Sequence, residues 1–390
     1  MARTTLPSRT DGRRSRSARL VAAATGALLL PLIPSGALAA TTSDACTYGY
    51  SAESSVFFGD GAAASGVTNY DVGNGCTLMD VIMADAPFAT HGEFLSTVGR
   101  VAAEQVRAGV ITDAERAAIV SAAAASEVGR PHPVTGTRAV DLSRIGLVGY
   151  TVRATMPSNA EGTLAALAEC GFQNMEPSGS VGNFYGYTAA RLAPLTQAAG
   201  IAVPSLGVSQ SNLENNLEGV IAEAHAIGAE YVRISGSSRW TLADYSRTAA
   251  VLNEVGAKLK EAGITVAYHN HGYEFETEEN GVTGYDVLVR ETDPELVTME
   301  LDVYWAASVG VDTVELFETY PGRFELLHLK DIAPDGSFAD VGAGTIDFAE
   351  IFANASLAGV EYSFTEHDQP RPDGVTSACA SLGYLTDLRY

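Results

Sequence analysis

The sequence predicts a (β/α)₈ barrel preceded by a small, mainly helical module. From residue 145 to the C-terminus, strand-like apolar segments alternate eight times with segments of helical periodicity. The connections between these segments are short, as in a closed parallel barrel. In addition, four successive strand candidates end in carboxylate, imidazole or ammonium side chains, and active sites of such barrels lie at that end of the strands.

The first 39 residues have the pattern of a signal peptide. Four arginines between residues 13 and 19 precede an apolar run over residues 20–33, and Ala37-Leu38-Ala39 provides a cleavage site. The apolar run is too short and too rich in small residues for a membrane span, and no second long run follows. We therefore expect a secreted mature chain, exported by the Sec or the Tat route, with no membrane span after cleavage.

The composition is strongly acidic, with 24 basic and 47 acidic residues. The predicted leader contains six arginines and one aspartate, so the mature chain would have 18 basic and 46 acidic residues and a net charge of −28. A field of that sign repels phosphate backbones, which argues against nucleic acid as a partner. The composition suits an extracellular protein that handles neutral sugars or cations.

Residues 44–129 are predicted to form a separate, Cys-containing module. It begins with a weakly patterned stretch and continues with helices expected over residues 77–85, 92–108 and 113–125. We interpret this module as a packing or docking unit. A linker over residues 130–144, rich in proline and glycine at its start, joins it to the barrel.

The barrel is assigned to residues 145–390. Its strands are predicted over residues 145–150, 173–176, 202–208, 231–235, 265–270, 297–302, 324–329 and 362–366. Its helices are predicted over residues 161–170, 189–199, 213–227, 241–262, 285–290, 313–320, 348–355 and 376–387. An open doubly wound sheet is the alternative, but the first crossover lacks the glycine-rich turn that such sheets usually have.

The chain has four cysteines, an even number that is compatible with disulfides in an exported protein. Cys46 and Cys76 lie in the same small module and are expected partners. Cys170 ends the first barrel helix and Cys379 lies in the eighth, so the two become neighbours only when the ring closes. Two buried thiols are the alternative for this second pair.

Metal-competent side chains lie at the ends of strands five to eight. In chain order they are His269, His271, Glu274, Asp302, His328 and Glu366, and Lys330 stands among them as a side chain that cannot bind a cation. Any one of them could be structural, for example Asp302 as a helix cap or Glu366 in an ion pair. Because four successive strands deliver such groups to one rim, a metal site is favoured.

Motifs along the whole barrel point to a known family. They are Gly146-Leu-x-x-Tyr-x-Val-Arg153, Asn183-Phe-Tyr-Gly186, Asn212-Leu-Glu-Asn-Asn-Leu217, Tyr268-His-Asn-His271 with Glu274, Leu301-Asp-Val-Tyr-Trp305, His328-Leu-Lys-Asp331 and Gly342-Ala-Gly-Thr-Ile-Asp347. On these motifs residues 145–388 resemble the sugar phosphate isomerase/epimerase family, a group of xylose isomerase-like barrels. Residues 76–88 resemble a small module of actinobacterial secreted proteins, so an exported member of that type is expected.

The resemblance implies a divalent cation held by side chains from strands five to eight. Carried over by position, the ligands are Asp302, His328 and Glu366, with His269 preferred over His271 as the fourth. Mn²⁺, Mg²⁺, Co²⁺ and Zn²⁺ all suit this set. The chain departs from the family twice: His269 replaces a glutamate that binds metal and moves a proton in the well-studied epimerases, and Gly207 replaces a frequent histidine.

The implied reaction is metal-assisted proton abstraction beside the carbonyl of a non-phosphorylated keto- or aldo-sugar, giving isomerisation or epimerisation. Glu366 or Glu274 is the expected base, and Lys330 is expected to stabilise the oxyanion. The expected substrate-binding residues are Arg153, Tyr185, His271 and Trp305. The partner is thus a small-molecule sugar, and the sequence leaves the oligomeric state open.

Two alternatives remain open at this stage. If a leaving group stands β to the enolate, the same chemistry gives elimination, as in a lyase or hydrolase of 3-keto-glycosides. A secreted sugar-binding barrel without turnover is the second alternative. His269 and Gly207 favour it mildly, whereas Asp302, His328 and Glu366 argue against it.

Overall fold

The computed structural model describes residues 50, 52, 54–58, 63–73, 75–86, 88, 90–130, 135–236 and 240–390. The predicted signal peptide, Cys46 and part of the predicted linker lie outside this set and stay predictions. These described residues all belong to one compact unit. No helix within the described residues has both the length and the apolar character needed to cross a membrane.

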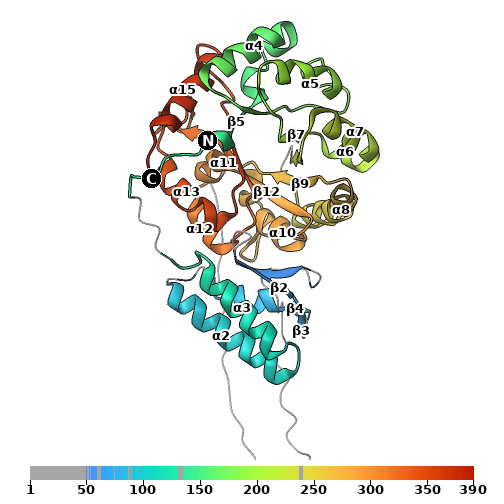
Figure 1. Ribbon diagram of the computed structural model, residues 1–390, viewed down its shortest axis with the longest axis vertical. Helices are drawn as coiled ribbons and strands as arrows, with labels where there is room; N and C mark the ends of the chain where they lie inside the picture. Colours follow the sequence, from blue (N-terminus) through green and yellow to red (C-terminus); the bar gives the residue numbers. More distant parts are fainter. Residues whose placement is uncertain are drawn as a thin grey trace, which may run out of the picture. The chain divides into compact units, whose positions relative to one another are not determined.

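Eight parallel strands form a nearly closed barrel (Figure 1), which confirms the predicted fold class. They are β5 (Ile145–Val148), β6 (Asn174–Glu176), β7 (Ser205–Gly207), β8 (Tyr231–Ser235), β9 (Thr265–His269), β12 (Val297–Asp302), β13 (Leu326–Leu329) and β16 (Tyr362–Thr365). Their order in the sheet is β6-β5-β16-β13-β12-β9-β8-β7. Two single bridges, Asn174–Ala202 and Ser178–Gly207, join the two end strands.

Helices flank the strands on the outside, as Figure 1 shows. They are α4 (Met156–Cys170), α5 (Ala189–Ala198), α6 (Gln210–Asn215), α7 (Leu217–Ile227), α8 (Leu242–Glu261), α10 (Gly284–Glu291), α11 (Val303–Ser308), α12 (Thr313–Thr319), α13 (Phe348–Ala353), α14 (Ala355–Ala358) and α15 (Gly374–Asp387). Capping boxes start α8 at Thr241 and α10 at Thr283. The helix expected over residues 213–227 is instead two helices, because Asn216 leaves helical geometry with φ −152°.

The third strand is shorter than expected. It covers Ser205–Gly207 rather than residues 202–208, because Pro204 has no N–H to donate to a neighbouring strand. The carbonyl of Pro204 nevertheless accepts hydrogen bonds from the backbone N–H groups of Glu230 and Tyr231. The register with β8 is therefore kept, and Gly207 pairs with Arg233.

The strands are almost wholly buried, as expected of a parallel sheet covered by helices. A small apolar cluster of inward-facing side chains fills the lower part of the barrel: Val148, Tyr231, Ala267, Leu326 and Phe364. Polar and charged inward residues begin one pleat further along the strands. The interior therefore places its charged groups toward the carboxyl ends, where the site was predicted.

The N-terminal region contains α1 (Leu78–Met83), α2 (His91–Ala108) and α3 (Asp113–Ala125), close to the predicted helices. It also contains two small antiparallel sheets that the sequence analysis missed. One pairs β1 (Ser55–Phe57) with β2 (Ala64–Thr68), and the other pairs β3 (Asp71–Gly73) with β4 (Cys76–Thr77). These strands have two to five residues and many small side chains, so their periodicity is weak.

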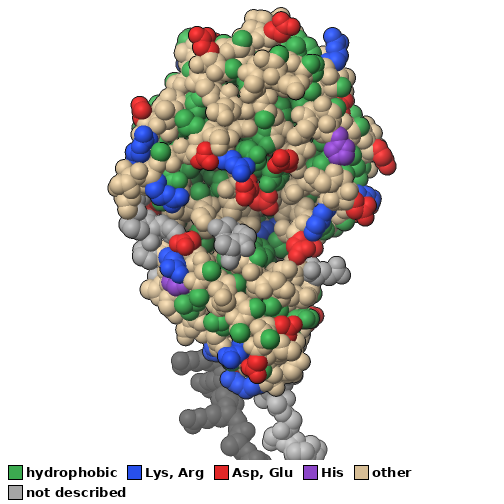
Figure 2. Space-filling view, viewed as in Figure 1, with side chains coloured by type: hydrophobic (Ala, Val, Ile, Leu, Met, Phe, Trp, Pro, Cys, Tyr) green, Lys and Arg blue, Asp and Glu red, His purple; other side chains and the backbone are tan. Residues whose placement is uncertain are grey.

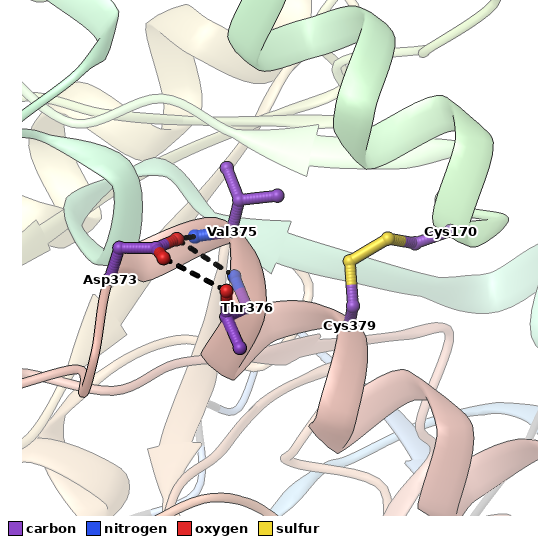
Figure 3. The surroundings of a disulfide bond; sticks show 5 residues. All are labelled: Cys170, Asp373, Val375, Thr376 and Cys379. Atoms are coloured by element: carbon purple, nitrogen blue, oxygen red, sulfur yellow. Dashed lines mark hydrogen bonds between the residues drawn. A yellow bond between two sulfur atoms is a disulfide. The ribbon is translucent and has the colours of Figure 1, made fainter.

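A disulfide joins Cys170 of α4 to Cys379 of α15 (Figure 3), with the two Cα atoms 5.5 Å apart. Near the start of α15, Asp373 accepts hydrogen bonds from the backbone N–H groups of Val375 and Thr376. The disulfide links the first and last helices of the barrel across 209 residues of chain. In the strand layer, β5 pairs with β16 and so joins the first strand of the barrel to the last. The disulfide makes the corresponding link in the outer layer of helices.

Replacing Cys170 and Cys379 together with alanine is expected to lower the free energy of unfolding by about 2–5 kcal/mol. The reason is that a crosslink over so long a loop removes much conformational entropy from the unfolded chain. Urea unfolding of the oxidised wild type and the double variant measures this difference. Equal midpoints and equal slopes for the two proteins would show that the disulfide adds no stability.

Candidate active site

Inward-facing positions of β8, β9, β12 and β13 hold charged or imidazole side chains: Arg233, His269, Glu300, Asp302 and His328. All of them are buried. The register places Glu300 beside His269 and Asp302 beside His328. Because side chains alternate between the two faces of a strand, Glu300 and Asp302 point to the same interior.

The first half of the cluster lies at the carboxyl ends of β12, β13 and β16. His328 Nδ1 is 3.1 Å from Glu366 Oε2 and 4.0 Å from Asp302 Oδ2. His269 Nε2 is 3.9 Å from the same Asp302 oxygen. Four side chains predicted as ligands thus meet in one buried place.

Asp302 performs two tasks at once. Its Oδ1 accepts a hydrogen bond from the backbone N–H of Trp305 and so caps α11. Its Oδ2 is buried, faces His269 and His328, and lies 3.0 Å from the ammonium of Lys330. The helix-cap and site interpretations of Asp302 are therefore compatible.

The second half of the cluster lies one pleat deeper and was not singled out in the sequence. Arg233 Nε is 2.7 Å from Glu176 Oε1 and 3.3 Å from Glu300 Oε2. His328 Nε2 lies 3.2 Å and 3.1 Å from the same two oxygens. The hydroxyl of Ser205 donates to the other oxygen of Glu176. This lower layer fixes the orientation of His328 from below.

Burial and neighbouring charges shift the pKa values of the carboxyl groups in opposite directions. Burial, and then the charge of Glu176, raises the pKa of Glu300 to about 7, and burial raises that of Asp302 to about 6. Burial would also raise the pKa values of Glu176 and Glu366. The charges of Arg233 and Lys330, respectively, outweigh it together with the hydrogen bond and charge of His328, and hold both pKa values below the usual range.

The side chains in the upper half of the cluster fit a single divalent cation. Ligand atoms bound to one ion at about 2.0–2.2 Å lie roughly 3–4 Å apart. Asp302 Oδ2 lies 4.0 Å from His328 Nδ1 and 3.9 Å from His269 Nε2, and Glu366 Oε2 lies 3.1 Å from His328 Nδ1. Two groups within the described residues have ligand atoms close enough for one ion: Asp302–His328–Glu366, and a deeper one of His269, Glu300 and His328.

Lys330 connects the upper half of the cluster to the rim. Its Nζ lies 3.0 Å from Asp302 Oδ2, 2.9 Å from Glu366 Oε2 and 3.1 Å from Asp368 Oδ1. The ammonium also lies 5.6 Å from the centre of the Trp305 ring and 5.7 Å from the centre of the Phe338 ring. Phe338 belongs to a hairpin formed by β14 (Asp331–Ile332) and β15 (Phe338–Ala339). Such contacts are favourable cation–π interactions.

Glu274 does not join this cluster as a free carboxylate. It is fully buried, and its two oxygens accept hydrogen bonds from the Tyr268 hydroxyl and the backbone N–H of His271, at 2.8 and 2.9 Å. Burial raises its pKa to about 7. This geometry favours a role in holding the loop after β9 over the predicted role as a base. The ring of His271 lies 5.4 Å from that of Trp305, on the rim, whereas His269 belongs to the cluster.

The remaining predicted substrate residues have structural partners. Arg153 donates to the carbonyls of Tyr150 and Asp368, so it fixes the loop that carries Asp368. Tyr185 has a positive φ of 58°, and its hydroxyl accepts a hydrogen bond from the backbone N–H of Ser178. Tyr185 therefore shapes the segment after β6, and Arg153 the segment after β16.

The last two motifs of the barrel have a shared structural role. Asp331 is buried and accepts hydrogen bonds from the backbone N–H groups of Ile332, Gly342, Gly344 and Ile346. A Cβ atom at Gly344 would lie 2.3 Å from Asp331 Oδ1. The aspartate thus binds the loop before α13, which requires glycine at this point of close approach.

In the face shown in Figure 2, acidic side chains gather beside a basic one near the middle of the barrel, in the area where Figure 1 shows α11 and β12. Other charged side chains lie toward the edges and the lower end of this face, singly or in small groups.

Comparison with known proteins agrees with this description of the barrel. Residues 164–375, more than half of the chain, match the family described as xylose isomerase-like TIM barrel. A solved structure of a sugar phosphate isomerase/epimerase from Parabacteroides distasonis ATCC 8503 superposes with a TM-score of 0.54 and 24% identity, over 66% of this chain and 98% of that one. That likeness shows the fold.

Curated relatives match part of the barrel. Inosose dehydratase from Geobacillus kaustophilus (strain HTA426) is 28% identical over 234 residues, which are 49% of this chain and 73% of that enzyme. Inosose dehydratase from Clostridium tetani (strain Massachusetts / E88) is 30% identical over 170 residues. That second match covers 38% of this chain and 56%, about half, of the relative.

Proposed function

Because this chain belongs to the xylose isomerase-like TIM barrel family, we propose that it is a divalent-metal enzyme that removes a proton beside the carbonyl of a neutral keto-sugar or keto-polyol and expels a β-hydroxyl group. The single observation that carries the proposal is the convergence of Asp302, His328 and Glu366 in one buried cluster, with His269 beside Asp302. The inosose dehydratases named among the relatives support elimination over epimerisation.

In this proposal the four clustered side chains hold the cation. When bound, it supplies Lewis acidity at a carbonyl and an adjacent hydroxyl, which acidifies the proton on the carbon between them. Glu366 takes that proton, since it is the carboxylate of the rim whose contacts are the other site groups, His328 and Lys330. Lys330 donates to the developing oxyanion. Trp305 covers the substrate from the rim.

The geometry also favours a mechanism with one proton-transferring carboxylate over a mechanism with two. Epimerisation by the two-carboxylate scheme needs a second proton-transfer group on the opposite face of the sugar, and both oxygens of Glu274 already accept hydrogen bonds, from the Tyr268 hydroxyl and the backbone N–H of His271. Elimination needs only one such group. Glu366 takes the proton from carbon and passes it to the departing β-hydroxyl on the same face; a C–H and a C–O bond break, a conjugated C=C bond forms, and water leaves.

The proposal is tested by incubating Mn²⁺-loaded protein with inosose and a panel of neutral keto-sugars. The expected product is a conjugated 2-hydroxy-enone or its 1,2-diketone tautomer, read by ultraviolet absorbance and by a mass loss of one water. An isomer of unchanged mass would instead support the epimerase alternative. Tight metal binding with no product from any substrate would support a sugar-binding barrel.

Replacing Lys330 with methionine is expected to tighten Mn²⁺ binding about tenfold or more while lowering turnover. The ammonium lies 3.0 Å from Asp302 Oδ2 and 2.9 Å from Glu366 Oε2, where it repels a second cation. Calorimetric titration of metal-free protein with MnCl₂ gives the affinity. Lys330→Arg keeps the charge and is the matched control; an affinity of the methionine variant equal to that of the wild type would contradict this view of Lys330.

We further propose that the protein acts outside the cytoplasm. The leader pattern supports export, and the Cys170–Cys379 disulfide suits an oxidising compartment. Expression with the full leader in an actinobacterial host, followed by N-terminal sequencing of protein from the medium, tests this. A mature chain starting at Ala40 is expected, and uncleaved protein retained in the cells would contradict export.

A further inference from the structure

A separate cavity lies at the carboxyl ends of β6, β7 and β8, on the opposite half of the barrel rim from β12, β13 and β16. Its volume is about 410 Å³, which falls in the usual range of small-molecule sites. Its lining contains none of the four clustered side chains to which the cation is assigned, and it also lacks Lys330. The cavity is therefore a distinct part of the rim.

The lining is rich in neutral hydrogen-bonding groups and contains one large aromatic ring. The hydroxyl and amide side chains are Ser178, Ser209, Gln210, Ser211 and Ser235. Half-buried Trp240 supplies the aromatic face. Hydroxyl and amide groups both donate and accept, and an indole ring packs against apolar C–H surfaces. A ligand with many hydroxyls on a C–H framework, that is, a sugar ring, satisfies both kinds of wall.

Among the described residues that line the cavity, Arg233 is the one charged side chain. Arg233 Nε is 2.7 Å from Glu176 and 3.3 Å from Glu300, so its charge is balanced inside the barrel. Its Nη2 donates to the hydroxyl of Ser178 on the cavity side. Within the described part of the lining, the one guanidinium is already paired with carboxylates, which favours a neutral ligand over a phosphate or a carboxylate.

Gly207 gives this cavity its shape. A Cβ atom at this position would lie 2.7 Å from Cζ of Arg233, so any side chain would displace the guanidinium from the wall. The absence of a side chain at Gly207 therefore leaves the space that the guanidinium of Arg233 occupies. Arg233 is a wall shared by the cavity and the layer beneath His328.

We propose that this cavity is a subsite for a second, neutral sugar ring, so that the substrate is a glycoside of a keto-sugar rather than a free monosaccharide. The inference rests on the proposed function, because the ring beside Asp302 and Glu366 is the one that reacts. The cavity and the ligand cluster share no side chain. Two linked rings contact both sets, with the second ring on Trp240.

The chain has two tryptophans, Trp240 in the cavity and Trp305 on the rim of the metal-ligand cluster. In a Trp305→Phe variant the fluorescence therefore reports on Trp240 alone. The metal-free variant is titrated with cellobiose, maltose, lactose and trehalose, and separately with glucose and glucose 6-phosphate. We expect at least one disaccharide to change the emission with a Kd at least tenfold below those of glucose and glucose 6-phosphate.

A second substitution locates the binding. Adding Ser235→Leu places an apolar side chain in the cavity and is expected to abolish the response, whereas Ser235→Thr keeps the hydroxyl and is expected to retain it. Circular dichroism and urea midpoints confirm that both variants are folded. The subsite is overturned if no disaccharide binds, if glucose binds as tightly, or if folded Ser235→Leu protein responds like its parent.

The two proposals fail separately. Enone formation by wild-type, metal-loaded protein tests the reaction, and the emission of Trp240 in metal-free protein tests the subsite. Turnover of free keto-sugars without disaccharide binding would leave the reaction standing and overturn the subsite. Disaccharide binding at Trp240 without turnover of any keto-sugar or keto-glycoside would support the subsite and overturn the reaction.

Discussion

Replacing Glu366 with glutamine is expected to lower kcat by about 10²–10⁴-fold, the usual contribution of a positioned proton-transfer group. Glutamine keeps the shape of the side chain but can neither take a proton nor offer a charged oxygen to His328 and Lys330, which lie 3.1 and 2.9 Å from Oε2. Steady-state kinetics on the keto-substrate identified by the enone screen measures the effect.

Glu274→Gln is the matched control, because Glu274 was the other base predicted from the sequence. Its oxygens accept hydrogen bonds from Tyr268 and from the backbone of His271, so we expect its substitution to disturb the loop and to lower kcat much less. A larger loss of kcat in Glu274→Gln than in Glu366→Gln would assign proton abstraction to Glu274 and restore the two-carboxylate scheme.

Replacing Arg233 with leucine is expected to lower the free energy of unfolding by about 3–5 kcal/mol, as when one partner of a buried ion pair is removed. Arg233 faces the buried carboxylates of Glu176 and Glu300 at 2.7 and 3.3 Å. Without the guanidinium, two acidic groups remain close together in the barrel interior. Urea unfolding measures the loss.

Two further variants identify the cause of that loss. Arg247→Leu removes an arginine that is 70% exposed and paired with Asp244 on the surface, and it is expected to change stability by at most about 1 kcal/mol. Adding Glu176→Gln to Arg233→Leu removes one of the unpaired charges and should recover part of the stability. Equal losses of unfolding free energy for Arg233→Leu and Arg247→Leu would show that the buried ion pairs of Arg233 stabilise the fold no more than a surface pair does.

Much of the barrel was predictable because each strand stands between segments of different periodicity. The strands Tyr231–Ser235 and Val297–Asp302 match the prediction to the residue. Two predicted strands were too long for local reasons. Pro204 shortens β7, and residues 149–152 form a 3₁₀ helix after β5. Those effects depend on hydrogen bonds, which hydrophobic periodicity does not describe.

The rim of the site was easier to predict than its lower layer. Asp302, His328 and Glu366 stand at the carboxyl ends of strands, where active sites of such barrels lie, and the structure brings them together. Glu300 and Arg233 lie within buried strands and were passed over. A charged residue inside a buried strand itself indicates a functional or paired group. Because side chains two residues apart point to the same face, Asp302 in the site predicts that Glu300 faces the site too.

The pairing of groups far apart in the chain could not have been read from local patterns. Glu176 meets His328 across 152 residues and Arg233 across 57, and both contacts exist only because the ring closes. In the same way, the engagement of Glu274 by Tyr268 depends on how the loop after β9 folds back on its strand. Glu274 was predicted from the sequence as a base, and its hydrogen bonds to Tyr268 and His271 are visible only in the structure.

Metal content tests the central claim most directly. The mature protein is purified without chelator or affinity-tag metal, supplied with Mn²⁺, desalted and analysed by mass spectrometry beside an Asp302→Ala/His328→Ala variant and, as a matched control, an Arg247→Ala variant. We predict about one equivalent of divalent metal in the wild type and the control, and its loss in the double variant. No bound metal in the wild type, or equal metal in all three folded proteins, would contradict the proposed site.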